Sequence, residues 1–183
     1  TYRVTDASGP MTTVTRDDGA VFIVPAEPSI TQSPSLVVAV TVPPGVNTQG
    51  VDIAGAKAAY YGWLDFGDRA LQDPGRDWSA EAAKWAMEPH LSRVLAELRE
   101  SASYHSHAEG HVSYHATVRS AFPDEVQMRV CGDASGLDIV DDRTGKSIRA
   151  DDGFRHVQYV TIARDVSGRW LISDIDSSSD ETC

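Results

Sequence analysis

Cysteine is scarce in this chain, whose 183 residues include only two, Cys131 and Cys183. Two cysteines so far apart form neither a CxxC redox motif nor the paired ligands of a zinc site. A disulfide between them would tie the last residue to a strand-like segment, and disulfides persist in oxidising compartments. By loop closure such a bond would stabilise the fold by roughly 4 kcal/mol. We therefore expect a structural disulfide and an extracytoplasmic protein.

Long apolar runs and an excess of basic residues are also missing. No run approaches the roughly 18 apolar residues of a membrane span, and no segment has the pattern of a signal peptide. The chain begins at Thr1 without a methionine, so we expect that a signal or membrane anchor has been removed. The net charge of -11 repels phosphate, which argues against nucleic-acid binding and against attraction to anionic membranes.

The common signatures of catalysis and cofactor binding are absent as well. The sequence has no Gly-x-Ser-x-Gly, no His-Glu-x-x-His, no P-loop and no Gly-x-Gly-x-x-Gly. Its acidic pairs lack the alternating ligand spacing of a calcium loop and are typical of turns and of a soluble surface. We predict no catalytic residue, no cofactor and no resident metal.

Proline is concentrated at the start of the chain, because six of the nine prolines lie in residues 1–50. Residues 12–15 and 20–24 read as two strands around an Asp-Gly turn, a combination typical of a hairpin. Residues 25–34 read as an extended linker. The apolar run 35–42 either adds a strand to a sheet or packs beneath one. We assign residues 1–50 to an extended arm and 51–183 to a domain.

The domain begins with a helical pattern. Asp52 is placed to cap a helix that ends near Leu71, with an apolar stripe at helical spacing. Ser79 can cap a second helix, and Pro89 stands near the first turn of a third. Trp63, Trp78 and Trp85 are expected in the core.

Beyond residue 103 the period falls to two, which predicts strands. They are expected at 111–122, 125–131, 155–163 and 169–176, with a short edge at 137–140. Helices followed by strands indicate an α+β domain, with an antiparallel sheet curved around the helices.

Several segments resemble the NTF2-like (cystatin-like) superfamily, and more narrowly the secreted or lipid-anchored NTF2-like proteins of actinobacteria. The segments are 59–63 (AYYGW), 91–98 (LSRVLAEL), 130–136 (VCGDASG), 140–146 (VDDRTGK), 168–174 (GRWLISD) and the terminal Thr182-Cys183. The resemblance covers roughly residues 54–183 and implies a cone built of helices and a curved sheet. It also implies that Cys131 and Cys183 are disulfide partners.

Two functions are compatible with this resemblance. The first is a non-catalytic extracytoplasmic interaction module, which binds a protein partner or itself, as in cell-envelope or conjugative transfer and secretion assemblies. It would meet the membrane only through the missing N-terminal anchor. The alternative is a pocket for a small hydrophobic ligand, or a ketosteroid-isomerase-like enzyme, with the cone interior lined by Tyr60, Trp63, Tyr114 and Tyr159.

Four histidines cluster at His105, His107, His111 and His115. On one extended strand His111 and His115 would lie about 13 Å apart, too far to share an ion. His105 and His107 would lie about 7 Å apart and could share a metal with Glu109 or His111. A solvated connection between helix and strand is the simpler interpretation, and a pH-responsive patch is a third.

Overall fold

The computed structural model describes residues 2–6, 11–16, 21–25, 38–149, 155–178, 181 and 183, with side-chain burial from residue 39 onward. Contacts divide the chain into two units, Thr1–Thr31 and Gln32–Cys183. Of the expected linker at 25–34, Pro25 is the last residue of a strand and the remainder lies outside the described residues, as does the Asp-Gly turn at 18–19. In the described part no helix is long and apolar enough to cross a membrane.

The first unit contains three strands in one antiparallel meander. They are β1 (Tyr2–Asp6), β2 (Met11–Arg16) and β3 (Val21–Pro25), joined in the order β1-β2-β3. Val14 pairs with Phe22 across the hairpin. The predicted hairpin is therefore confirmed, whereas β1 is a strand that the sequence analysis did not predict.

Helix α1 (Ile53–Gln72) begins and ends where the sequence predicts. The Asp52 carboxylate accepts a hydrogen bond of 2.8 Å from the backbone N–H of Gly55, which satisfies one of the unpaired donors at the helix start. The buried stripe includes Ala56, Tyr60 and Trp63. A helix capped in this way and apolar on one side is held in place by packing on the sheet.

Two further helices follow, α2 (Ser79–Ala82) and α3 (His90–Ser103). Ser79 is the first residue of α2 and does not cap it, which corrects the prediction. Instead, the carboxylate of Asp77 accepts hydrogen bonds from the backbone N–H of Ser79, at 3.0 Å, and from its hydroxyl, at 2.7 Å. Pro89 directly precedes α3, as expected.

The main sheet has five strands in the order β11-β10-β7-β6-β4. They are β4 (Val38–Thr41), β6 (Ser113–Ala121), β7 (Glu125–Asp133), β10 (Arg155–Arg164) and β11 (Trp170–Ser178). The four later strands match the predicted ones and pair antiparallel, but β4 pairs parallel with β6. The sheet is therefore mixed, which corrects the wholly antiparallel prediction.

Because β4 joins this sheet, residues 38–50 lie in the second unit, although the sequence analysis assigned them to the arm. Of its two alternatives for 35–42, the added strand is the one that the structure shows. A smaller sheet contains β5 (Ser106–Gly110), β8 (Leu137–Asp141) and β9 (Lys146–Ser147). Strand β5 was expected to be a connection, since its sequence is polar and contains glycine.

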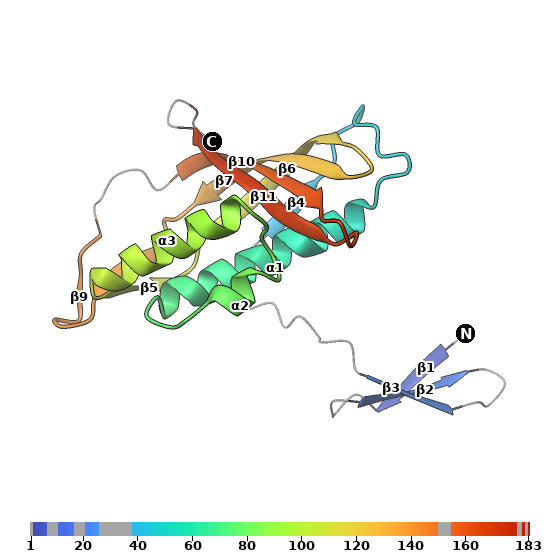
Figure 1. Ribbon diagram of the computed structural model, residues 1–183, viewed down its shortest axis with the longest axis horizontal. Helices are drawn as coiled ribbons and strands as arrows, with labels where there is room; N and C mark the ends of the chain where they lie inside the picture. Colours follow the sequence, from blue (N-terminus) through green and yellow to red (C-terminus); the bar gives the residue numbers. More distant parts are fainter. Residues whose placement is uncertain are drawn as a thin grey trace. The chain divides into compact units, whose positions relative to one another are not determined.

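Helices α1 and α3 lie along one side of the five-stranded sheet (Figure 1). We call this side the inner face. It contributes fully buried side chains from three neighbouring strands, namely Val118, Val126, Met128, Val130, Val160 and Ile162. The opposite side, which we call the outer face, carries Arg129, Cys131 and Tyr159, whose positions alternate with those of the buried residues. Helices packed on a mixed sheet define an α+β fold.

Candidate functional site

Three of the four residues expected to line a pocket meet at the inner face. Tyr60 and Trp63 project from α1 and are buried, and Tyr114 projects from β6 and packs against the same core. Tyr159 is not part of this group, because it lies on the outer face, opposite Arg129. The alternation of β10 separates Tyr159 from the other three.

A narrow cleft remains where Trp63 and Tyr114 approach the end of α1. Its volume is about 80 Å³, and Leu64, Asp68, Val112 and Leu137 also line it. Ligand pockets in proteins usually measure about 300–1,000 Å³. The space is therefore sufficient for a few atoms and not for a steroid-sized molecule.

Asp68 and Tyr114 give this cleft its chemical character. Removal from water, and then the neighbouring Asp65 carboxylate, raise the pKa of Asp68. Burial, and then the Asp68 charge, raise the pKa of Tyr114 to about 12. At neutral pH the Tyr114 hydroxyl is thus protonated and able to donate a hydrogen bond.

The sequence analysis missed Asp68. Its position was available from spacing, since residues 60, 64 and 68 repeat every four positions and share one side of α1. The nearby Asp65 pairs with Arg69 at 3.0 Å and belongs to another side of the helix.

Three buried donors near α1 have no hydrogen-bond partner within the described part of the chain: Tyr60 Oη, Trp85 Nε1 and His90 Nε2. Burial, and then the Arg93 charge, lower the pKa of His90 to about 4, so this ring is neutral in the core. Its ring centroid lies 5.0 Å from that of Trp63, with the two rings tilted, and its Nδ1 accepts a hydrogen bond of 2.9 Å from Arg93. His90 therefore acts as a core residue.

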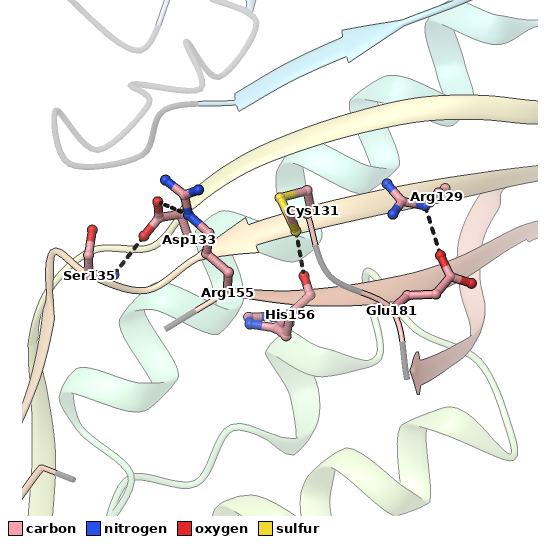
Figure 2. The surroundings of a disulfide bond; sticks show 8 residues. Arg129, Cys131, Asp133, Ser135, Arg155, His156 and Glu181 are labelled. Carbon is pink, nitrogen blue, oxygen red and sulfur yellow. Dashed lines mark hydrogen bonds and ion pairs between the residues drawn. A yellow bond between two sulfur atoms is a disulfide. The ribbon is translucent and has the colours of Figure 1, made fainter. Parts of the chain in front are cut away.

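The outer face is organised by the C-terminal tail. Cys131 on β7 and Cys183 are joined by a disulfide, with their Cα atoms 5.7 Å apart (Figure 2). The Cys183 sulfur also contacts the His156 carbonyl oxygen at 3.3 Å. A pair of cysteines at disulfide distance is what an oxidising environment favours.

Glu181 fastens the same tail by polar contacts. Its carboxylate pairs with Arg129 at 3.2 Å and accepts a hydrogen bond from the Tyr159 hydroxyl. These contacts lower the pKa of Glu181, the Tyr159 bond having the larger effect. Arg119 stacks over the Tyr159 ring at 5.0 Å. Tyr159 thus has a role in holding the tail, and no sequence pattern indicates this pairing.

The ends of β7 and β10 are tied beside the disulfide (Figure 2). Asp133 accepts a hydrogen bond of 2.9 Å from the Ser135 backbone N–H and pairs with Arg155 at 3.0 Å. The Ser135 bonds, followed by Arg155, lower the pKa of Asp133 to about 2. The carboxylate is therefore occupied in a turn and an ion pair.

The four clustered histidines do not share one strand: His107 lies in β5 and His115 in β6, whereas His105 precedes β5 and His111 lies between the two strands. His107 on β5 bonds Asp142 at 2.6 Å and Glu109 at 3.3 Å, and these contacts raise its pKa. Within the described ranges, no group of three or more His, Cys, Asp or Glu side chains is arranged to hold a metal ion. His107 connects β5 to the turn after β8.

No family model matches the sequence, and no curated protein matches it. Among solved structures, it is similar to the crystal structure of the intermembrane space region of the chloroplast protein ARC6, at 12% identity and a TM-score of 0.48. The match covers 69% of this chain and 96% of that one. The class defined here is an α+β domain whose tail is held by a disulfide.

Proposed function

We propose that this chain is a non-catalytic interaction module with an NTF2-like cone, which works outside the cytoplasm by binding a protein partner or a second copy of itself. It is secreted, or anchored to the outer face of the cytoplasmic membrane by a segment outside this sequence. Modules of this kind suit cell-envelope and conjugative transfer or secretion assemblies. The arm at the start of the chain contributes to the association.

One observation carries the proposal: the space between the helices and the inner face is filled by side chains. Tyr60, Phe66, Met128, Ile162 and Ile172 are each almost completely buried there. Within the described residues, a cleft of about 80 Å³ lies beside them. A filled interior leaves the surface as the place where this domain meets other molecules.

The extracytoplasmic location is supported by the tail. A disulfide between Cys131 and Cys183, which are 52 residues apart, constrains a large part of the domain. Such a bond persists in a secreted or envelope protein and is reduced in most cytosols. The cone is supported by the element order, since three helices precede four of the five strands of the sheet that covers α1 and α3.

A second function, a small-ligand pocket or a ketosteroid-isomerase-like enzyme, is favoured by one feature. An aspartate and a tyrosine, Asp68 and Tyr114, line one apolar cleft, and their pKa values are both raised. A ligand there would raise the melting temperature of the protein, and Tyr114→Phe would abolish that shift. A broad set of apolar ligands without a shift would exclude this function.

Sedimentation of the intact chain tests the interaction module. We expect a concentration-dependent mass above that of the monomer, or a partner retained through purification from the envelope fraction. Removal of residues 1–31, which leaves β4 in its sheet, should weaken this association. Association that is equally strong without the arm would remove the arm from the proposal, and a monomer that retains no partner would contradict the proposal itself.

A further inference from the structure

An open groove lies between α3 and the loop of residues 74–79 that leads from α1 to α2. Its volume is about 500 Å³, which falls within the range of binding sites, whereas the interior cleft measures about 80 Å³. The C-terminal half of α3 forms one wall, and the loop forms the other.

The floor of the groove is apolar and held firmly in place. It consists of Trp78 from the loop and Leu98 from α3, which are almost completely buried, and of Leu95 from α3, which is partly exposed. The Trp78 indole donates a hydrogen bond of 2.8 Å to the Asp73 carbonyl, and its ring meets Phe66 edge-on at 5.9 Å. A floor fixed before binding loses little conformational entropy when a ligand arrives.

Two arginines line the groove. Arg76 lies over the Trp78 ring, with its guanidinium carbon 4.3 Å from the ring centroid, and Arg99 extends from α3. Neither forms an ion pair with a carboxylate in the described part of the chain. Arg69, at 5.7 Å from the same ring, is by contrast paired with both Asp65 and Glu81.

A shortage of carboxylates does not explain the unpaired arginines, because the chain has 27 Asp and Glu against 16 Lys and Arg. The carboxylate within the groove, Asp77, is engaged by Ser79 at the start of α2. Arg99 acts on Asp77 only through a weak Coulombic contribution that lowers its pKa. The guanidinium groups of Arg76 and Arg99 thus remain available for an outside anion.

We propose that this groove binds an acidic peptide segment of a protein partner, with an apolar side chain against Leu95 and carboxylates on Arg76 and Arg99. An apolar centre with charged residues at the rim is the anatomy of a protein interface, in which Trp and Arg carry much of the binding energy. Guanidinium groups bind carboxylates through two parallel hydrogen bonds. This inference rests on the proposed interaction function and names the surface and the chemistry of its partner.

Fluorescence anisotropy of the intact chain with two labelled peptides tests the groove. One peptide alternates leucine and glutamate, and the other carries lysine at every glutamate position. We expect the acidic peptide to bind at least about 10-fold more tightly, because only its charges complement the arginines. Arg76→Gln and Arg99→Gln should each weaken its binding by about 5- to 10-fold, the loss of one charge-assisted hydrogen bond.

The matched control is Arg169→Gln, which removes an exposed arginine of the β10–β11 turn that pairs with Asp165. We expect this variant to bind the acidic peptide as the intact chain does. Leu95→Asp, which places a charge on the floor, should abolish binding, and circular dichroism checks that all four variants are folded. Equal binding of both peptides, or binding unaffected by both Arg76→Gln and Arg99→Gln, would overturn the proposal.

Two further results distinguish failure of the groove proposal from failure of the proposed interaction function. A chain that associates in sedimentation while the acidic peptide does not bind overturns the groove alone. Binding of the peptide only after removal of residues 1–31 also overturns it, since the occupant would then be this chain's own arm.

Discussion

The two faces of the five-stranded sheet are closed in different ways. The inner face is covered by α1 and α3, and its residues, such as Met128 and Ile162, are buried by apolar packing. The outer face is fastened by a single tail, through the Cys131–Cys183 disulfide and the contacts of Glu181 with Arg129 and Tyr159. One face depends on the exclusion of water, and the other on a covalent bond and on charge.

This difference shows why one side chain of β10 is buried on the outer face. Val157 pairs with Cys131 and is fully buried, although its neighbours on this face are polar. We attribute its burial to the tail that the disulfide holds over this part of the sheet. Loss of the disulfide should therefore destabilise the outer face, and a cavity in the core should destabilise the inner face. We expect each change to have little influence on the effect of the other.

The largest effect is expected on the outer face from loss of the disulfide. Replacing Cys131 and Cys183 by serine should lower the free energy of unfolding by about 4 kcal/mol, because a loop across 52 residues gains conformational freedom in the unfolded chain. Urea unfolding with and without reductant measures this loss. An unfolding midpoint that is unchanged by reduction would contradict the role given to the tail.

The inner face should respond to a cavity. Met128→Ala removes a fully buried side chain and should cost about 2–4 kcal/mol, whereas Gln127→Ala, next to it on the outer face, should stay within about 0.5 kcal/mol. Urea unfolding in both redox states is the measurement. If the two faces are independent, the cost of Met128→Ala is the same in each state.

A smaller effect is expected where the inner face has no room for a methyl group. A Cβ at Gly132 would lie 2.6 Å from the His156 ring, so Gly132→Ala should cost about 1–3 kcal/mol. Gly67 on α1 is the matched control, because a Cβ there meets no atom within 4 Å and alanine favours the helix. Gly67→Ala should raise the free energy of unfolding by about 0.5–1 kcal/mol. Thermal unfolding of the Gly132→Ala and Gly67→Ala variants measures the two effects. If Gly132→Ala is as well tolerated as Gly67→Ala, the His156 ring moves aside freely.

The smallest expected effect is a dependence of the free energy of unfolding on pH, which arises from Glu181 on the outer face. The pKa of Glu181 is lower in the folded protein, so its contribution to stability is present above the pKa of the unfolded chain, 4.5. It is lost as the pH falls through the lower folded-state value. Glu181→Gln should remove this part of the acid dependence, as measured by unfolding over a pH series. An unchanged pH profile would mean that Glu181 does not hold the tail.

Much of the fold could be predicted from the sequence because local signals agreed with tertiary packing. The cap at Asp52, the stripe through Tyr60 and the alternation in residues 125–131 each predicted the observed element. Strand β5 was not predicted, because its polar sequence has no strand pattern of its own and becomes a strand by pairing with β8. The parallel pairing of β4 likewise depends on contact with β6, which is distant in the sequence.

The candidate sites were less predictable. Aromatic residues at helical spacing placed Tyr60 and Trp63 together, and a period of two could place Tyr114 opposite them but could not show that Tyr159 faces away. The groove at Trp78 depends on how a loop packs against α3. Its unpaired arginines become visible only when the ion pairs of the surrounding residues are known.

The most direct test of the filled interior is the melting temperature of the chain with small apolar ligands, beginning with benzene, in parallel with Met128→Ala. An engineered apolar cavity of sufficient size can bind benzene, whereas a filled core has no place for it. We expect no shift in melting temperature for the intact chain and a rise for the cavity variant. A rise in the intact chain that Tyr114→Phe removes would contradict a filled interior and would favour the ligand-binding function.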